Sequence, residues 1–129
     1  MPTVLSAFPA KQLGNKTRIF KFVWTAAADG SITSATTGEE VHGYITKLRT
    51  DPLSPNPTAN YGVTLKDADG CDMLGGAGAG RSASVAEQFM PQVGAVYFPS
   101  RVDGVLTFAA TGNSVNAAVG EFYAVVEVD

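Results

Sequence analysis

Glycine and proline interrupt this chain so often that long regular helices are excluded. The 129 residues hold 14 glycines and 7 prolines, accompanied by Ser, Thr, Asn and Asp between short apolar runs. Glycine is costly to order inside a helix or strand, and proline removes a backbone donor. Short apolar runs bounded by such residues are typical of strands joined by turns. The sequence therefore predicts an all-β fold.

The strongest strand signal is residues 18–25 (RIFKFVWT), a run of branched and aromatic side chains that suits a pleated surface. Because the run is almost continuously apolar, we expect both of its faces to be covered, one of them by a partner. In residues 121–128, alternation places Phe122, Ala124 and Val126 on one face. Further strands are expected in residues 31–36, 41–50, 61–66, 71–74, 93–98 and 104–111.

About eight short strands, with turn signals at ~8–12-residue spacing, predict a single-domain antiparallel β-sandwich or barrel. Residues 1–16 hold two prolines and no clean periodicity, so we expect an extended N-terminal arm before a single β domain, residues 17–129. Ser84–Met90 is the only segment that could form a helix, of two turns at most.

Two further segments are expected to be loops that cannot hold themselves in place. Residues 51–60 carry three prolines, and residues 75–80 read GGAGAG. Long loops of this kind in a compact domain are usually either disordered or functional. Strict alternation in residues 41–50 would put Lys47 on the same face as Ile45, and Leu48 on the opposite face.

Charge divides the sequence unevenly. Residues 1–28 hold four basic residues and no acidic one, whereas residues 29–129 hold five basic and twelve acidic residues, for a net charge of −3. A basic arm on an acidic body would suit an acidic partner surface, although it can equally be a solvated segment. The sequence contains no stripe of interleaved basic and aromatic residues, so nucleic-acid binding is not expected. The sequence contains no apolar run of ~18 residues, so no membrane-spanning helix is expected.

Catalytic motifs are not expected. The single histidine, His42, lies within a predicted strand, and the single cysteine, Cys71, has no basic neighbour and is expected to be half-buried. The acidic run Asp67–Asp72 lacks the final carboxylate of a calcium loop, so we interpret it as a turn. The glycines of residues 75–80 have the wrong spacing for a phosphate loop. The sequence predicts no enzyme, no metal and no cofactor.

Several motifs across residues 18–128 carry a resemblance to known proteins. They are the run Ile19–Thr25, Ala28-Asp29-Gly30-Ser31, Gly43-Tyr44-Ile45, Thr50-Asp51-Pro52, the pattern from Pro57 to Gly76 (PTxNYxVTLxDxDGxDxLGG), and Ser114-Val115-Asn116 before Gly120. Together they resemble a family of small virion proteins of tailed bacteriophages.

This resemblance implies a structural protein without catalysis, made in the host cytoplasm and located in the virion. Our first choice is a capsid decoration (cement) protein that binds between subunits of the major capsid protein, as a homo-oligomer with a trimer preferred. The residues expected at the partner interface are Phe8, Lys11, Lys16, Arg18 and Arg81.

Two alternatives remain at this point. Within virions, the chain would form a ring as a tail or head–tail joining protein. Outside virions, it would be a small-ligand or glycan-binding β-barrel with Trp24, Tyr44 and Tyr61 lining a pocket, unless these aromatic side chains belong to the core.

Overall fold

The structure, a computed structural model, describes residues 3–7, 11–13 and 16–129. Those residues form twelve strands and no helix, so none of them builds a helix that could cross a membrane. The strands are β1 (Thr3–Ala7), β2 (Lys11–Leu13), β3 (Thr17–Thr25), β4 (Ala35–Thr36), β5 (Val41–Pro52), β6 (Gly62–Lys66), β7 (Glu87–Phe89), β8 (Gln92–Val93), β9 (Val96–Tyr97), β10 (Ser100–Gly104), β11 (Thr107–Thr111) and β12 (Val119–Val128).

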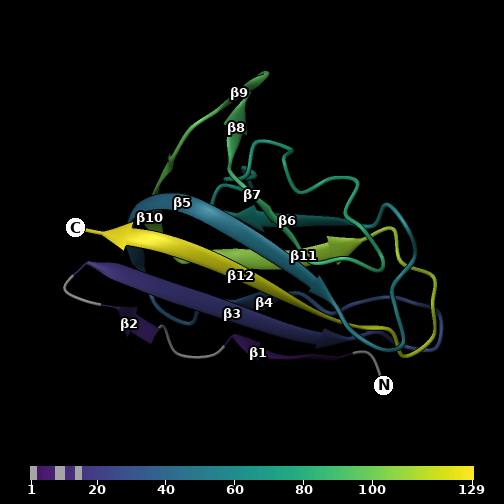
Figure 1. Cartoon of the computed structure of the whole chain (residues 1–129). Coiled ribbons are helices and arrows are strands. Elements are labelled where there is room, and N and C mark those ends of the chain that lie inside the picture. The colour runs from purple at the N-terminus through teal and green to yellow at the C-terminus, as the bar shows by residue number, and fades with distance from the viewer. Residues whose placement is uncertain (1–2, 8–10, 14–15) are drawn as a thin grey trace.

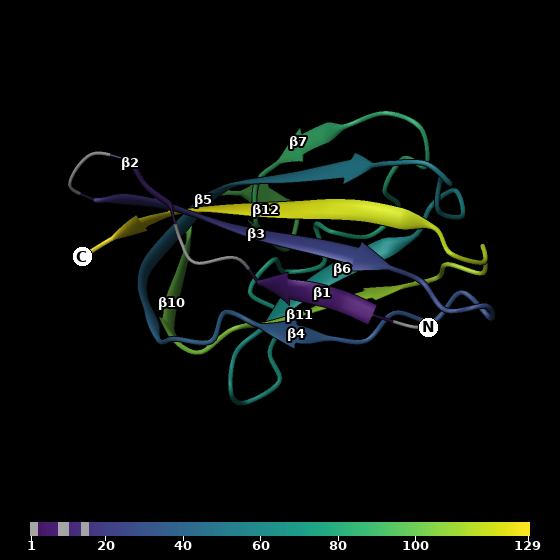
Figure 2. The same ribbon diagram turned by 90° about the horizontal axis from the view of Figure 1, so that it is seen from below.

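Two antiparallel sheets form a β-sandwich, which confirms the predicted fold class (Figures 1 and 2). The larger sheet has the order β1-β3-β12-β5-β10, with β2 also pairing with β3 and β7 also pairing with β5. The smaller sheet has the order β4-β11-β6. Strands β8 and β9 pair only with each other, and Figure 1 shows this hairpin projecting from the body of the sandwich.

The core lies between the two sheets and is built by alternation. Strand β3 turns Phe20, Phe22 and Trp24 inward, while the residues on its other face are partly exposed. Strand β12 buries alternate residues, as the alternation in residues 121–128 predicted. The Phe108 ring of β11 stacks on both Phe22 and Phe122, with centroids 5.0 Å apart in each pair. Each large side chain buried in this way stabilises the fold by about 1.5–3 kcal/mol.

A β-bulge in β5 changes the alternation that the sequence predicted. In the pairing with β12, Val125 lies opposite Lys47 and Val126 opposite Ile45, so Thr46 has no partner. One extra residue reverses which side chains face inward. Leu48 is therefore fully buried with Ile45, while Lys47 is exposed. The expectation that Lys47 shares the face of Ile45 is wrong for this reason.

Residues 1–16, expected as an extended arm, contain two short strands that the sequence did not predict. Strand β1 pairs antiparallel with the second half of β3, from Thr3 opposite Thr25 to Ala7 opposite Phe22. Strand β2 pairs with its first half. The other edge of β3 is occupied by β12, so β1 and β2 satisfy the backbone groups on the edge that would otherwise be open.

Short elements differ most from the sequence-based expectation. The segment Ser84–Met90 forms no helix, and its residues 87–89 pair with β5 as strand β7. Residues 99–103, expected as a loop, largely belong to β10. Residues 93–98, expected as one strand, lie largely in the β8–β9 hairpin. In residues 31–36 only the last two form a strand, and residues 73–78 form turns.

The glycine-rich loop 75–80 is held by the body of the protein. The Val63 amide donates to the Gly78 carbonyl at 3.0 Å, and the Arg81 amide donates to the Tyr61 carbonyl at 2.7 Å. A Cβ at residue 78 would lie 2.1 Å from the Val63 carbonyl oxygen, so this close approach requires glycine. The expectation that this loop cannot hold itself in place is wrong.

The proline-rich segment 51–60 is anchored as well. The Val119 amide donates to the Pro55 carbonyl at 3.0 Å, and the Leu53 amide donates to the Val119 carbonyl at 2.9 Å. The Thr58 amide donates to the Asn113 side chain at 2.9 Å. Both expected interaction loops are thus occupied by internal contacts.

Candidate interaction surfaces

The five expected interface residues lie on different parts of the chain. Phe8 lies outside the residues that the structure describes. Lys11 belongs to β2, where it pairs with Ile19. Lys16 is exposed in the turn before β3, and its carbonyl accepts a hydrogen bond from the Val128 amide at 2.6 Å. None of these facts tests their predicted role, which stays a prediction.

Arg18 and Arg81 both have partners inside the chain. Arg18 forms an ion pair with Glu39, and its guanidinium lies 5.3 Å from the centre of the Phe20 ring. Arg81 lies 4.3 Å from the centre of the Phe89 ring and 3.7 Å from a Glu87 oxygen. Both contacts to Arg81 come from residues of β7, so this side chain helps to fix that short strand on the body.

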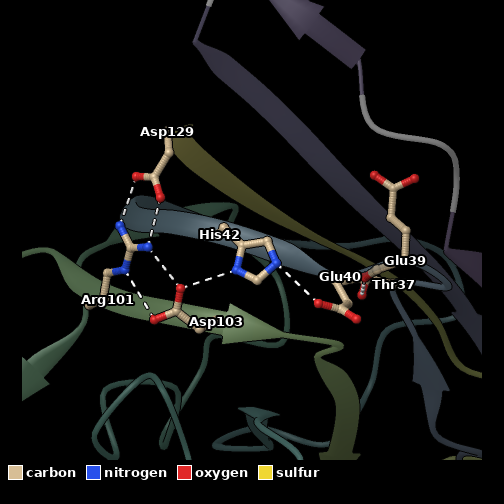
Figure 3. Close-up of polar contacts among 7 residues, drawn as sticks. All are labelled: Thr37, Glu39, Glu40, His42, Arg101, Asp103 and Asp129. Carbon is tan, nitrogen blue, oxygen red and sulfur yellow. Dashed lines mark hydrogen bonds and ion pairs between the residues drawn. The ribbon is translucent and has the colours of Figure 1, made fainter.

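A polar cluster surrounds His42 on the exposed side of β5 (Figure 3). The imidazole Nδ1 lies 3.1 Å from an Asp103 oxygen, and Nε2 lies 3.1 Å from a Glu40 oxygen. The Arg101 guanidinium makes two hydrogen bonds with Asp103, at 3.1 and 2.7 Å, and two with Asp129, both at 2.7 Å. The cluster thereby joins β5 and β10 to the residue that follows β12.

The electrostatics of this cluster follow from its hydrogen bonds. Arg101, and to a smaller extent His42, lower the pKa of Asp103 to about 2. Asp103 and then Glu40 raise the pKa of His42 above its usual 6.5. Both imidazole nitrogens are occupied by carboxylates, so the arrangement offers no base to a hydroxyl or thiol nucleophile. We interpret the cluster as a surface ion-pair network that fastens the end of β12.

The acidic run after β6 binds the backbone. One Asp67 oxygen accepts hydrogen bonds from the Asp69 amide at 3.0 Å and the Cys71 amide at 2.9 Å. The Asp72 carboxylate accepts from three amides, those of Leu65, Leu74 and Gly76. These side chains therefore stabilise turns, and the described residues contain no group of His, Cys, Asp or Glu arranged to hold a metal ion. Cys71 is exposed, not half-buried as expected.

The aromatic side chains proposed to line a pocket do not share one. Trp24 and Tyr61 are fully buried and meet edge to face, with centroids 5.9 Å apart. Burial raises the pKa of Tyr61 to about 12. Tyr44 is exposed on the outer side of β5, where the Arg101 guanidinium lies 5.3 Å from its ring centre. Two of the three belong to the core, so the binding-barrel alternative loses its predicted lining.

The most unusual surface is the β8–β9 hairpin. Every residue from 93 to 99 (VGAVYFP) is exposed and none is charged. Four of the exposed large apolar side chains lie here: Val93 (64% exposed), Val96 (61%), Tyr97 (61%) and Phe98 (43%). Contiguous exposed apolar surface of this kind makes the hairpin a candidate interaction site. Sequence reasoning treated this segment as an ordinary strand, although the uncharged run from residue 88 to residue 100 was a usable signal.

The comparisons with known proteins add little to this picture. No family model matches the sequence, and no curated protein matches it. Among solved structures, a chain described as "Cyanophage Pam1 capsid asymmetric unit" is 14% identical, with a TM-score of 0.43 over 97% of this chain and 95% of that chain. A TM-score of this size carries no argument about fold or function.

Proposed function

We propose that this chain is a non-enzymatic structural protein of a phage virion. More specifically, we assign it as a capsid decoration protein that stabilises the shell by binding between subunits of the major capsid protein. It acts as a homo-oligomer, preferably a trimer, and needs no cofactor. The observation that carries the proposal is the exposed, uncharged hairpin β8–β9 on a body whose other long loops are engaged internally.

The resemblance to small virion proteins of tailed bacteriophages supports the proposal, because its motifs meet in space. Three of them lie far apart in the sequence, at Gly30, Thr58 and Ser114. The Ser114 amide donates to the Thr58 hydroxyl at 2.8 Å. A Cβ at residue 30 would lie 2.4 Å from the Ser114 Cα, so this approach requires glycine. The shared motifs are thus residues that join three loops of the sandwich.

The proposal also fits the surface chemistry. The polar side chains that could have formed a catalytic site instead hold one another, as in the network of His42, Asp103 and Arg101. Apolar surface is concentrated on one projection, which suits a contact between the subunits of a homo-oligomer.

Co-sedimentation with capsid shells tests the assignment. Shells are assembled from the major capsid protein of the virus that encodes this chain, and the purified protein is titrated onto them. A decoration protein binds to a fixed saturating number of copies per shell and delays the thermal disruption of the shell. Absence of binding, together with rings of six or more copies in solution, would instead indicate the tail or head–tail joining role.

A further inference from the structure

We propose that the β8–β9 hairpin is the self-association element of this protein, with residues Val93–Phe98 packing against the same residues of further copies around a rotation axis. The inference rests on the proposed function, because it assigns to the proposed homo-oligomer a defined contact. It concerns contacts between copies of this chain, not the contact with the shell.

The hairpin is an insertion into one edge strand of the larger sheet. Strands β7 and β10 pair with the same edge of β5: Phe89 lies opposite Leu48, and Ser100 lies opposite Ile45. Only Thr46 and Lys47 separate those positions on β5, so two residues would bridge the gap. The chain uses residues 90–99 instead. Neither β8 nor β9 joins a sheet of the sandwich, and residues 93–99 of the insertion are all exposed, so this part adds nothing to the core packing.

The hairpin has the composition of a buried element but not its surroundings. An isolated two-stranded hairpin is marginal in water. Here no third strand joins β8 or β9 among the described residues, and Val96 and Tyr97 expose most of their surface. Val93 lies opposite Val96, which places two valines on one face, while Tyr97 points to the other. Both faces therefore gain from being covered.

The base of the hairpin is fixed in place. The Gln92 amide donates to the Leu74 carbonyl at 3.1 Å, and the Phe98 amide donates to the Pro91 carbonyl at 3.1 Å. Gly75 lets the base of the hairpin lie close to the loop 75–80, because a Cβ at residue 75 would lie 1.7 Å from the backbone carbonyl oxygen of Gln92. A projection anchored in this way is presented in one orientation, so association requires little further ordering.

Charge favours a second copy as the occupant. No residue between Glu87 and Arg101 is charged, so a contact between two hairpins desolvates no charged group. A second copy of the chain carries the same uncharged hairpin, because its sequence is identical. Elsewhere among the described side chains, the exposed large apolar residues are only Tyr44, Val85 and Val105. No comparable patch can receive the hairpin there, so the contact joins hairpin to hairpin.

The size of the hairpin favours a closed ring over a pair. A stable interface typically covers ~800 Å² on each partner, which is a large area for so short a hairpin. In a ring around a rotation axis, each hairpin contacts two neighbours, and both of its faces are used. This arrangement agrees with the preferred trimer.

The test measures solution mass by multi-angle light scattering over a tenfold concentration range. The wild-type protein is expected to exceed the 13.4 kDa of one chain. Val96→Asp probes one face of the hairpin and Tyr97→Asp the other. We expect at least one of them to raise the dissociation constant tenfold or more, because a charge would be buried in the contact. Val105→Asp, beyond the far end of β10, is the matched control and keeps the wild-type mass.

Melting temperatures test whether each variant still folds. If an aspartate variant does not fold, Val96→Thr, which keeps the shape of valine, replaces Val96→Asp, and Tyr97→Ser replaces Tyr97→Asp. A monomeric wild type at every concentration overturns the inference, as does an oligomer that none of the hairpin variants weakens. Co-sedimentation with shells separates the two proposals. A monomer that binds shells leaves the decoration role intact, whereas an oligomer that ignores shells leaves only the self-association.

Discussion

The indole ring of Trp24 lies directly over Gly120, its partner in the register of β3 and β12. A Cβ built on residue 120 would lie 2.2 Å from the Cζ2 atom of that ring. Glycine is thus required here by the space that the indole occupies. Because β3 and β12 form the centre of the larger sheet, this pair tests how tightly the core is packed.

Gly120→Ala should destabilise the protein by about 1–3 kcal/mol, because the indole must move to admit a methyl group. The free energy of unfolding in urea measures the loss. Gly62→Ala is the matched control in β6, where the nearest atom to an added Cβ is 3.6 Å away. Equal effects of the two substitutions would contradict the close packing of Trp24 on Gly120.

Trp24→Ala should cost about 3–5 kcal/mol, because the side chain is fully buried and its removal leaves a cavity. Urea denaturation followed by far-ultraviolet circular dichroism measures the loss, since the variant lacks the only tryptophan. Val85→Ala, at an exposed position, should change stability by less than about 0.5 kcal/mol. A loss below about 1 kcal/mol for Trp24→Ala would place that side chain outside the core.

The pKa of His42 should lie above 6.5 in the folded protein and fall towards that value in Asp103→Asn. Asp103 is the main cause of the raised pKa, and Glu40 is the second. Glu40→Gln should therefore lower the pKa by a smaller amount. The chain has one histidine, so its proton resonances report the titration directly. An unchanged midpoint in Asp103→Asn would show that the two side chains do not interact in solution.

The same network predicts opposite pH dependences for its two members. The raised pKa of His42 contributes stability below pH 6.5, and this contribution is lost as the pH rises through the folded-state pKa. The lowered pKa of Asp103 contributes above its ordinary value of 3.8 and is lost as the pH falls towards about 2. Both side chains are exposed, so added salt should weaken the two effects.

Deleting residues 1–16 should leave a folded sandwich with one bare sheet edge. Strand β3 keeps β12 on its other side, but it loses the partners that β1 and β2 provide. We expect a lower melting temperature and concentration-dependent aggregation, because an open edge pairs with other chains. Deletion of residues 1–2, which precede β1, is the control. A truncated protein that melts and elutes like the full chain would show that this pairing contributes nothing.

The central strands could be predicted because their sequences carry their own pattern. Residues 121–128 alternate, so the buried face of β12 follows from the spacing, whereas the nearly continuous apolar run of residues 18–25 predicts a strand without choosing its buried face. Strand β5 could not be assigned in the same way. Its bulge at Thr46 depends on the register with β12, and the residue type at position 46 does not predict it.

Short edge strands and the hairpin are decided by partners elsewhere in the chain. Strands β1, β2 and β7 have three to five residues each, too few for a periodic signal, and they are ordered by pairing with β3 or β5. The hairpin presented the opposite difficulty. Its apolar residues read as an ordinary strand, and only the tertiary structure separates a buried strand from an exposed one.

The pairing of β3 with β12 has a consequence for how the protein folds. The Thr17 hydroxyl donates to the Glu127 carboxylate across 110 positions of sequence, and the whole centre of the larger sheet spans that interval. Contacts so distant in sequence form slowly, because a long loop must close before they stabilise anything. During synthesis, β3 therefore cannot pair with β12 until residues 119–128 have left the ribosome. Until then β3 can pair with β1 and β2, which precede it in the chain.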